Sequence, residues 1–231
     1  MAKSIPLEPA APRPNLKRNR ILMVEDHPIL REGMAKLINH EEDMVVCAEA
    51  ETAHDAIEMV DKHKPDLLLL DITLKDGSGL DVLKELKSRH PHLPTLILSM
   101  HDESLYAERA LRAGARGYVM KGETPAKVIT AIRRVLANEI SLSEDMTRTA
   151  LVRLGGGKRE ASTIEELSDR ELEIFQAIGR GLSTREIADT LHLSMKTIAS
   201  HRENIKVKLK LKSSSDLMKQ AIHWMHTNRL V

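Results

Sequence analysis

The sequence predicts an α/β domain with a five-stranded, parallel, doubly wound sheet, followed by a smaller all-α domain. Three observations lead to this prediction. Short apolar runs alternate with helix-like segments up to about residue 140, only helical segments follow residue 164, and basic residues collect near the end of the chain. A length of 231 residues suits one or two domains of roughly 150 residues each. We therefore expect two parts, each with its own core.

The first domain is expected over residues 20–140. Its strands are predicted at the apolar runs ILMV (21–24), MVV (44–46), LLLL (67–70), TLIL (95–98) and GYVM (117–120). Its helices are predicted between and after these runs, at 28–39, 52–63 (opened by a Thr52-x-x-Asp55 cap), 79–89, 102–113 and 124–137. Regular alternation of strands and helices is typical of a parallel, flavodoxin-like sheet with helices on both faces.

The second domain is expected over residues 164–231. A linker at 141–163 precedes it, with a possible helix at 143–154 and then three consecutive glycines. Four helices are predicted beyond the linker, because capping boxes stand at Ser168-x-x-Glu171 and Ser183-x-x-Glu186 and N-cap serines at Ser194 and Ser213. At the other end, residues 1–19 contain four prolines and almost nothing apolar, which predicts a disordered leader.

The charges of the two parts differ. The whole chain has 35 basic and 34 acidic residues, a net charge of +1. Residues 194–231 hold 8 basic and 2 acidic residues and sum to +6, so the preceding residues sum to −5. A basic end on an acidic body predicts a polyanionic partner at that end. With one Trp, two Tyr and one Phe, the chain lacks a stacking platform for single-stranded nucleic acid.

Other composition features exclude further classes of protein. A single cysteine excludes an intrachain disulfide and any cysteine-based zinc or cluster site. No apolar run approaches ~18 residues and the first residues do not form a signal peptide. The sequence therefore predicts a soluble, cytoplasmic protein that has no membrane partner.

Carboxylates follow the predicted strands at the points where the strands end. Glu25 and Asp26 follow the first strand and Asp71 the third, while Ser99 ends the fourth and Lys121 follows the fifth. In an open parallel sheet these positions converge on one crevice. Three converging acids favour a hard cation bound by oxygen ligands, so we expect Mg²⁺ as cofactor. A lysine and a serine beside them suit a phosphoryl group.

Four sequence segments carry a resemblance to a known family: ILMVEDHPILREG, LLLLDITLKDGSG, LILSMHDE and GARGYVMK. Over about residues 20–140 the chain resembles the receiver domain of two-component response regulators. The resemblance implies that Asp71 is the phosphoryl acceptor and that Asp26, Asp71, the Thr73 carbonyl and, through water, Glu25 bind Mg²⁺. It further implies that Ser99 and Lys121 bind the phosphoryl oxygens and that Tyr118 is the aromatic switch.

The resemblance has one departure. The family commonly has Met-Pro shortly after the phosphorylated aspartate, and this chain has Leu74-Lys75. A turn without the proline is expected to be looser, which would affect the efficiency of phosphorylation more than the identity of the acceptor.

The basic end carries a second resemblance. The segments LSDRE (167–171), GLS (181–183), EIA (186–188), LSMKTI (193–198), HRENI (201–205) and KL (208–209) resemble the LuxR-type helix-turn-helix domain of NarL/FixJ response regulators. A helix from Ser194 to about Lys210 would turn Ile198, Ile205 and Leu209 toward the core. We expect DNA contacts from its other sides, by Lys196, Thr197, Ala199, Ser200, His201, Glu203, Asn204, Lys206, Val207 and Lys208.

Together these features predict a DNA-binding response regulator and not an enzyme. A sensor histidine kinase would phosphorylate Asp71, and the phosphorylated protein would form a homodimer on double-stranded DNA. Two alternatives remain open. A haloacid-dehalogenase-type phosphatase would need a second aspartate two residues after the nucleophile, where this chain has Thr73. A receiver-like protein could also bind DNA regardless of phosphorylation.

Overall fold

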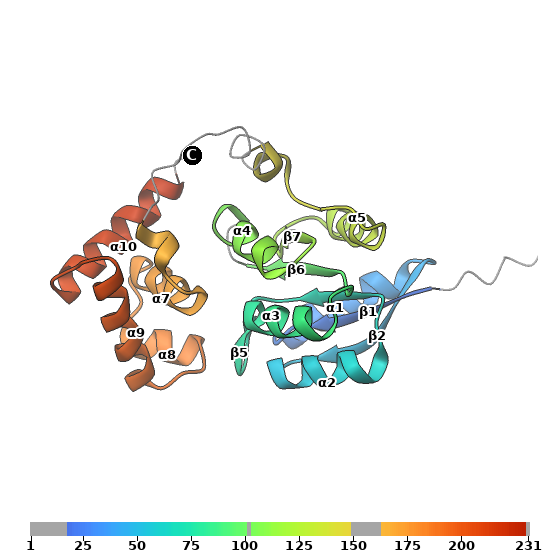
Figure 1. Ribbon diagram of the computed structural model, residues 1–231, viewed down its shortest axis with the longest axis horizontal. Coiled ribbons are helices and arrows are strands. Elements are labelled where there is room, and N and C mark those ends of the chain that lie inside the picture. Colours follow the sequence, from blue (N-terminus) through green and yellow to red (C-terminus); the bar gives the residue numbers. More distant parts are fainter. Residues whose placement is uncertain (1–17, 101–102, 149–162, 230–231) are drawn as a thin grey trace, which may run out of the picture.

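The computed structural model describes residues 18–100, 103–148 and 163–229. In the first part, five parallel strands form a sheet in the order β2-β1-β3-β6-β7 (Figure 1). The strands are β1 (Asn19–Val24), β2 (Met44–Ala50), β3 (Leu67–Leu70), β6 (Thr95–Ser99) and β7 (Gly117–Met120). The helices are α1 (Pro28–His40), α2 (Ala53–His63), α3 (Gly79–Arg89), α4 (Glu103–Ala113) and α5 (Pro125–Leu136). The predicted doubly wound α/β fold is therefore confirmed.

Alternate residues of each inner strand pack on opposite faces of the sheet, as the pleat requires. In β1, Leu22 and Val24 join the core beneath α2, α3 and α4, whereas Ile21 and Met23 join the core beneath α1 and α5. All four side chains are fully buried. The inner strands β1, β3 and β6 contain continuous apolar runs because helices cover both faces of the sheet. Because all five strands run parallel, their carboxyl ends lie at the same edge of the sheet.

A short hairpin that the sequence did not predict follows β3. It consists of β4 (Thr73–Leu74) and β5 (Gly77–Ser78), which pair antiparallel. The hairpin returns the chain close to the end of β3, where the Gly79 amide donates to the Ile72 carbonyl at 2.7 Å. A Cβ atom on Gly79 would lie 1.9 Å from the Asp71 carbonyl oxygen, so only glycine fits this approach.

The second part is helical, as predicted. It contains a 3₁₀ turn η1 (Thr163–Glu166) and the helices α7 (Asp169–Gly179), α8 (Thr184–Thr190), α9 (Met195–Lys208) and α10 (Ser214–Arg229). Both predicted capping boxes are present, and the Ser194 and Ser213 side chains accept from the backbone amides of Thr197 and Asp216. Phe175 meets Trp224 edge to face, with ring centroids 5.7 Å apart, and this contact joins α7 to α10.

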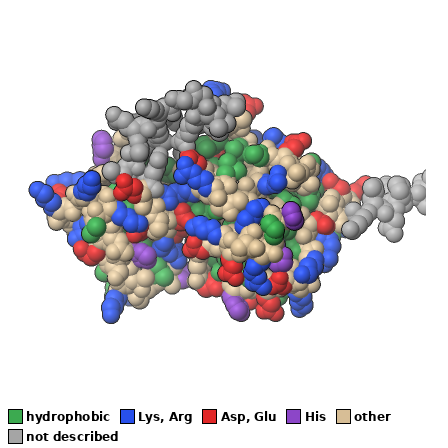
Figure 2. Space-filling view, viewed as in Figure 1, with side chains coloured by type: hydrophobic (Ala, Val, Ile, Leu, Met, Phe, Trp, Pro, Cys, Tyr) green, Lys and Arg blue, Asp and Glu red, His purple; other side chains and the backbone are tan. Residues whose placement is uncertain are grey.

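Helix α7 docks on α3 and α4 of the sheet domain. Arg109 of α4 donates to the Leu167 carbonyl at 2.7 Å and to Asp169 at 3.1 Å, and Lys84 of α3 reaches Asp169 at 3.0 Å. The Tyr106 hydroxyl lies 3.4 Å from Gln176. Figure 2 shows acidic and basic side chains meeting where the two domains adjoin. The docked face of α7 thus carries polar side chains, and buried apolar side chains of the two domains also form one continuous core cluster.

Residues 1–17 of the predicted leader lie outside the described residues, and its predicted end at residue 19 is wrong, because Asn19 already begins β1. In the predicted linker, residues 144–148 are helical, and the rest of the expected 143–154 helix and the three glycines are not described. Within the described ranges, no helix is both long and apolar enough to cross a membrane.

Candidate functional site

Four potential ligand side chains meet at the carboxyl edge of the sheet. Glu25 and Asp26 follow β1 and Asp71 follows β3, and one ligand atom from each of these and from His27 lies within 4.8 Å of the others. The three acids are 2%, 8% and 3% exposed, whereas the His27 side chain is 66% exposed. Three buried carboxylates in one place form a strongly negative site.

Lys121, directly after β7, is the positive group of this site. Its Nζ donates to Asp71 Oδ2 at 2.7 Å and to Glu25 Oε1 at 2.9 Å. Its backbone amide donates to the Ser99 carbonyl at 2.9 Å, which joins the ends of β6 and β7. Burial lowers the pKa of the ammonium, but the Asp71 and Glu25 carboxylates raise it more, so the pKa lies above its usual value. Lys121 therefore carries a permanent positive charge beside Asp71.

Asp71 is the carboxyl whose chemistry the site alters most. Burial raises its pKa to about 7; Lys121 opposes this rise and the charges of Glu25 and Asp26 add to it. Its Oδ1 accepts from the amide of Ile72 at 2.7 Å. A carboxyl with a pKa near 7 is only partly ionised at neutral pH in the absence of a further cation.

The site fits a divalent cation. Asp26 Oδ1 and Glu25 Oε2 are buried and have no hydrogen-bond partner. His27 Nδ1 lies 2.6 Å from Asp26 Oδ1 and Lys121 Nζ 2.7 Å from Glu25 Oε2, but neither contact has hydrogen-bond geometry. Buried carboxylate oxygens without donors are unfavourable unless a cation satisfies them. The all-oxygen donor set suits Mg²⁺.

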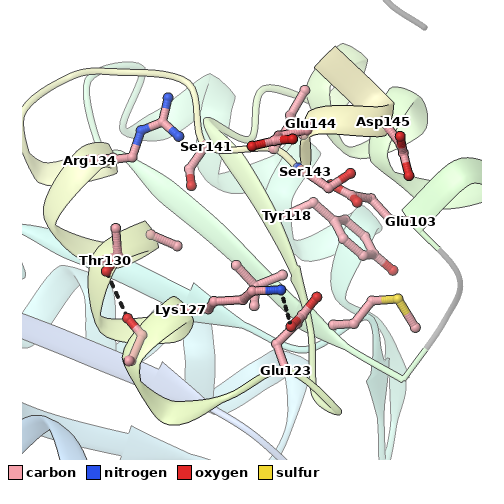
Figure 3. Close-up of a pocket in the computed structure, with 15 residues that line it drawn as sticks. Glu103, Tyr118, Glu123, Lys127, Thr130, Arg134, Ser141, Ser143, Glu144 and Asp145 are labelled. Atoms are coloured by element: carbon pink, nitrogen blue, oxygen red, sulfur yellow. Dashed lines mark hydrogen bonds and ion pairs between the residues drawn. The ribbon is translucent and has the colours of Figure 1, made fainter. Parts of the chain in front are cut away.

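The other predicted phosphoryl-site residues lie on β4, β6 and β7. Ser99 is fully buried at the end of β6 and Tyr118 is 2% exposed in β7. Figure 3 shows Tyr118 among the side chains lining a cavity of about 600 Å³ between β7, α5 and residues 141–145. Thr73 opens the hairpin that follows Asp71. Sequence reasoning missed His27, although its position directly after the acidic pair could have indicated it.

Side-chain contacts hold the turn after Asp71, which was expected to be looser without the proline. Lys75 forms an ion pair with Glu51. Asp76 accepts from the backbone amides of Ala53 at 2.6 Å and His54 at 3.3 Å, in the first turn of α2. The absence of the proline is thus accompanied by two side-chain anchors that connect the turn to β2 and α2.

Helix α9 presents the predicted nucleic-acid face to solvent. Ile198 and Ile205 are fully buried and Leu209 is 6% exposed, which confirms the predicted core side. Lys196, Ala199, Ser200, Glu203, Asn204 and Val207 are exposed, and Thr197, His201, Lys206 and Lys208 are partly exposed. Burial lowers the pKa of His201, which favours the neutral form of its imidazole.

Two lysines of α9 already have carboxylate partners. Lys208 Nζ donates at 2.7 Å to Glu171, the capping-box residue of α7, and this lysine fastens α9 to α7. Lys206 lies 2.9 Å from Glu203 on the exposed face. The sequence did not indicate the first pair because the two residues are 37 positions apart.

Comparisons with known proteins agree with both parts of the site. Residues 21–133 match the response regulator receiver domain, and residues 165–221 match the luxR family of bacterial regulatory proteins. The chain is 33% identical over 211 residues to the oxygen regulatory protein NreC of Staphylococcus epidermidis, covering 88% of this chain and 96% of that protein. The chain belongs to the NarL/FixJ family of two-component response regulators. This response regulator is therefore a DNA-binding transcription regulator and not an enzyme, which excludes the phosphatase alternative.

Solved structures share its architecture. A LuxR-family response regulator from Aurantimonas sp. SI85-9A1 has a TM-score of 0.56 at 34% identity, covering 60% of this chain and 99% of that chain. RcsB from Salmonella enterica serovar Typhimurium, bound to the rprA promoter in the presence of the phosphomimetic BeF₃⁻, has a TM-score of 0.59 at 24% identity and covers 88% and 98% of the two chains. At that identity the second likeness supports the fold alone.

Proposed function

We propose that this response regulator is switched by transfer of a phosphoryl group from a sensor histidine kinase to Asp71, with Mg²⁺ as cofactor. The observation that carries the proposal is the buried cluster of Glu25, Asp26 and Asp71 with Lys121 bonded to Asp71. A cluster with three acids and one lysine favours an added cation. A cytoplasmic location and a kinase partner are parts of the same proposal.

In this proposal Asp26, Asp71, the Thr73 carbonyl and, through water, Glu25 hold the metal ion. The bound ion would supply positive charge that lowers the pKa of Asp71 and offsets negative charge on the transferring group. A carboxylate oxygen of Asp71 forms the new bond to phosphorus as the bond to the donor's leaving group breaks. Lys121 and Ser99 then hydrogen-bond the phosphoryl oxygens, and Tyr118 responds as the aromatic switch.

We further propose that the chain divides into a leader (1–18), a receiver domain (19–140), a linker (141–163) and a DNA-binding domain (164–231). Phosphorylation would promote a homodimer on double-stranded DNA with two half-sites, because one recognition helix contacts few base pairs. The exposed residues of α9 would face the bases, namely Lys196, Ala199, Ser200, Glu203, Asn204 and Val207. Thr197, His201, Lys206 and Lys208 would lie toward the phosphates.

Labelling by a small phosphodonor tests the acceptor. Wild-type protein incubated with acetyl phosphate and Mg²⁺ should gain one hydroxylamine-sensitive phosphoryl group, and Asp71→Asn should gain none. Asp145→Asn is the matched control, because its side chain is 93% exposed. Labelling of the Asp71→Asn variant at the wild-type rate would show that the acceptor is another residue.

Magnesium titration tests the metal ligands separately. Asp26→Ala should weaken Mg²⁺ binding measured by calorimetry, because it removes a direct carboxylate ligand. Unchanged affinity would remove Asp26 from the site.

Binding selection on random DNA tests the base-facing surface. If the Glu203 carboxylate accepts from a cytosine amino group, Glu203→Gln should relax the preference at one base position per half-site by about 1–3 kcal/mol. Lys206→Ala, at a position that would lie toward the phosphates, should instead weaken binding to all DNA sequences alike and reduce the salt slope by about one ion. If Glu203→Gln tightens binding to every sequence equally, Glu203 only pairs with Lys206 and reads no base.

A further inference from the structure

Lys75 occupies the position where the family commonly has proline. The backbone conformation of the turn would also accept a proline there. Lys75 and Asp76 are the two central residues of the turn that joins Leu74 to Gly77. Neither is among the described residues with positive φ. Negative φ at both central positions suits a type I turn, which favours proline at the first of them. What distinguishes a lysine from a proline at this position is therefore its charged side chain.

The Lys75 side chain belongs to a bridge between two loops of the site. It pairs with one carboxylate oxygen of Glu51, just after β2, and the other oxygen accepts from Arg31 of α1 at 2.6 Å. Arg31 also donates to the main-chain carbonyl of Glu25 at 2.8 Å. The bridge Arg31–Glu51–Lys75 thus joins the turn after Asp71 to the loop that begins with Glu25.

The members of the bridge differ in exposure. The Arg31 side chain is 14% exposed, and those of Glu51 and Lys75 are 38% and 44% exposed. The hydrogen bond from Lys75 and the charge of Arg31 lower the pKa of Glu51, so the carboxylate stays ionised near neutral pH. Asp76 adds a second anchor beside it, through its bonds to the first turn of α2.

We propose that Lys75 and Glu51 are positioning residues for the metal site, and that their ion pair replaces the restraint of the missing proline. The inference rests on the proposed magnesium site. Thr73, whose carbonyl is the proposed third protein ligand, lies two residues before Lys75 in the hairpin. A hairpin held against the Glu25 loop keeps that carbonyl near the Glu25–Asp26 pair. Without the bridge, the hairpin would have to become ordered when the metal ion binds, and this cost would lower the affinity for the ion.

The proposal predicts an effect opposite in sign to simple electrostatics. Removing a nearby positive charge should by itself strengthen the binding of a cation. Loss of the bridge should weaken it, because the hairpin must then be ordered when the metal binds. A partly exposed ion pair stabilises a structure only weakly, so its loss should raise the dissociation constant by roughly 1.4- to 5-fold. We expect Lys75→Ala to show this weaker binding.

Magnesium titrations at two ionic strengths provide the test, with full-length wild type, Lys75→Ala, Lys75→Pro and the control Lys36→Ala. Lys36 is an exposed lysine of α1 paired with Glu32. At low salt, Lys75→Ala should bind Mg²⁺ more weakly than wild type, and Lys75→Pro at least as tightly. At about 1 M salt, where screening acts within ~3 Å, the difference between wild type and Lys75→Ala should disappear. Lys75→Pro should then bind more tightly than wild type, because a proline restraint is not screened.

Outcomes that contradict the proposal can be told apart from failure of the metal site. Lys75→Ala with affinity equal to or higher than that of wild type at low salt would overturn the positioning role. Weaker binding by Lys75→Pro and Lys75→Ala alike, at both salt concentrations, would show that the lysine acts through something other than the restraint. Asp26→Ala titrated in parallel reports on the site itself: unchanged binding there would contradict the proposed magnesium site and not the bridge. Equal melting temperatures of the variants would exclude a general loss of structure.

Discussion

Asp71→Asn should stabilise the metal-free protein at alkaline pH, although it removes the proposed phosphoacceptor. The Asp71 carboxyl is 3% exposed, and its pKa is raised from 3.8 to about 7. Between these values the folded protein holds a proton that the unfolded chain has released. Stability therefore falls as the pH rises through this window. The change in pKa corresponds to roughly 4 kcal/mol above pH 7.

Asparagine resembles the neutral carboxyl in shape and has no charge to bury. We therefore expect Asp71→Asn to raise the free energy of unfolding of the receiver domain by about 2–4 kcal/mol at pH 8 in a chelator. The gain should shrink to about 1 kcal/mol or less at pH 4.5, where the Asp71 carboxyl of the folded wild type is largely protonated and therefore neutral. Mg²⁺ should reduce the gain at pH 8, because it stabilises the ionised wild type.

Hydrogen exchange of the β3 amides and calorimetry would measure this effect. Tryptophan fluorescence is unsuitable, since Trp224 lies in the helical domain. The control Asp145→Asn, at an exposed position, should change stability little at either pH. If Asp71→Asn is less stable than wild type at pH 8, or if its gain is the same at pH 4.5, the burial of an unfavourable charge is not what sets the stability of this site.

Three further predictions concern packing and docking. Arg109→Ala should weaken docking of α7 by about 2 kcal/mol, since it truncates a largely buried charge pair. The radius of gyration measured by X-ray scattering should therefore increase, whereas the exposed control Arg112→Ala on the same helix should leave it unchanged. An unchanged radius for Arg109→Ala would contradict the docking contacts. Lys208→Ala should lower the unfolding free energy of the helical domain by about 1–3 kcal/mol, because it leaves the buried Glu171 without its cation. A urea titration followed by tryptophan fluorescence would detect this loss, and a variant as stable as wild type would refute the prediction. Gly79→Ala should lower the stability of the receiver domain by about 3 kcal/mol or more, because its Cβ would overlap the main chain; a calorimetric scan matching wild type would show that the loop adjusts freely.

Local patterns in the sequence predicted the elements and the acid cluster well. The inner strands are continuous apolar runs because both of their faces are covered, and parallel strands bring their carboxyl ends to one edge, so Asp26 and Asp71 could be placed together. Strand β2 was predicted too short, at 44–46 against Met44–Ala50. It lies at the edge of the sheet and is partly exposed, so its second half does not form an apolar run.

Contacts between distant side chains could not be predicted in the same way. The pairs Lys75–Glu51 and Lys208–Glu171 join residues 24 and 37 positions apart, and nothing in the local pattern of either lysine indicates a partner. The hairpin after β3 has two-residue strands, which are too short for periodicity to reveal. The docking of α7 depends on how two domains meet, which lies beyond the reach of patterns within either one.

The polar character of the docked face of α7 has a consequence for how signals could travel. Asp169, Glu173 and Gln176 follow one another at spacings of four and three residues, so they form one stripe, and the structure buries or half-buries all three. Such side chains also interact well with water, so the stripe suits a reversible contact between two domains, which covalent linkage favours by effective concentration. The exposed residues of α9 remain uncovered in the docked form. Docking would therefore control the position of α9 relative to the α9 of a second molecule. It would not control access to the exposed residues of α9, which stay uncovered.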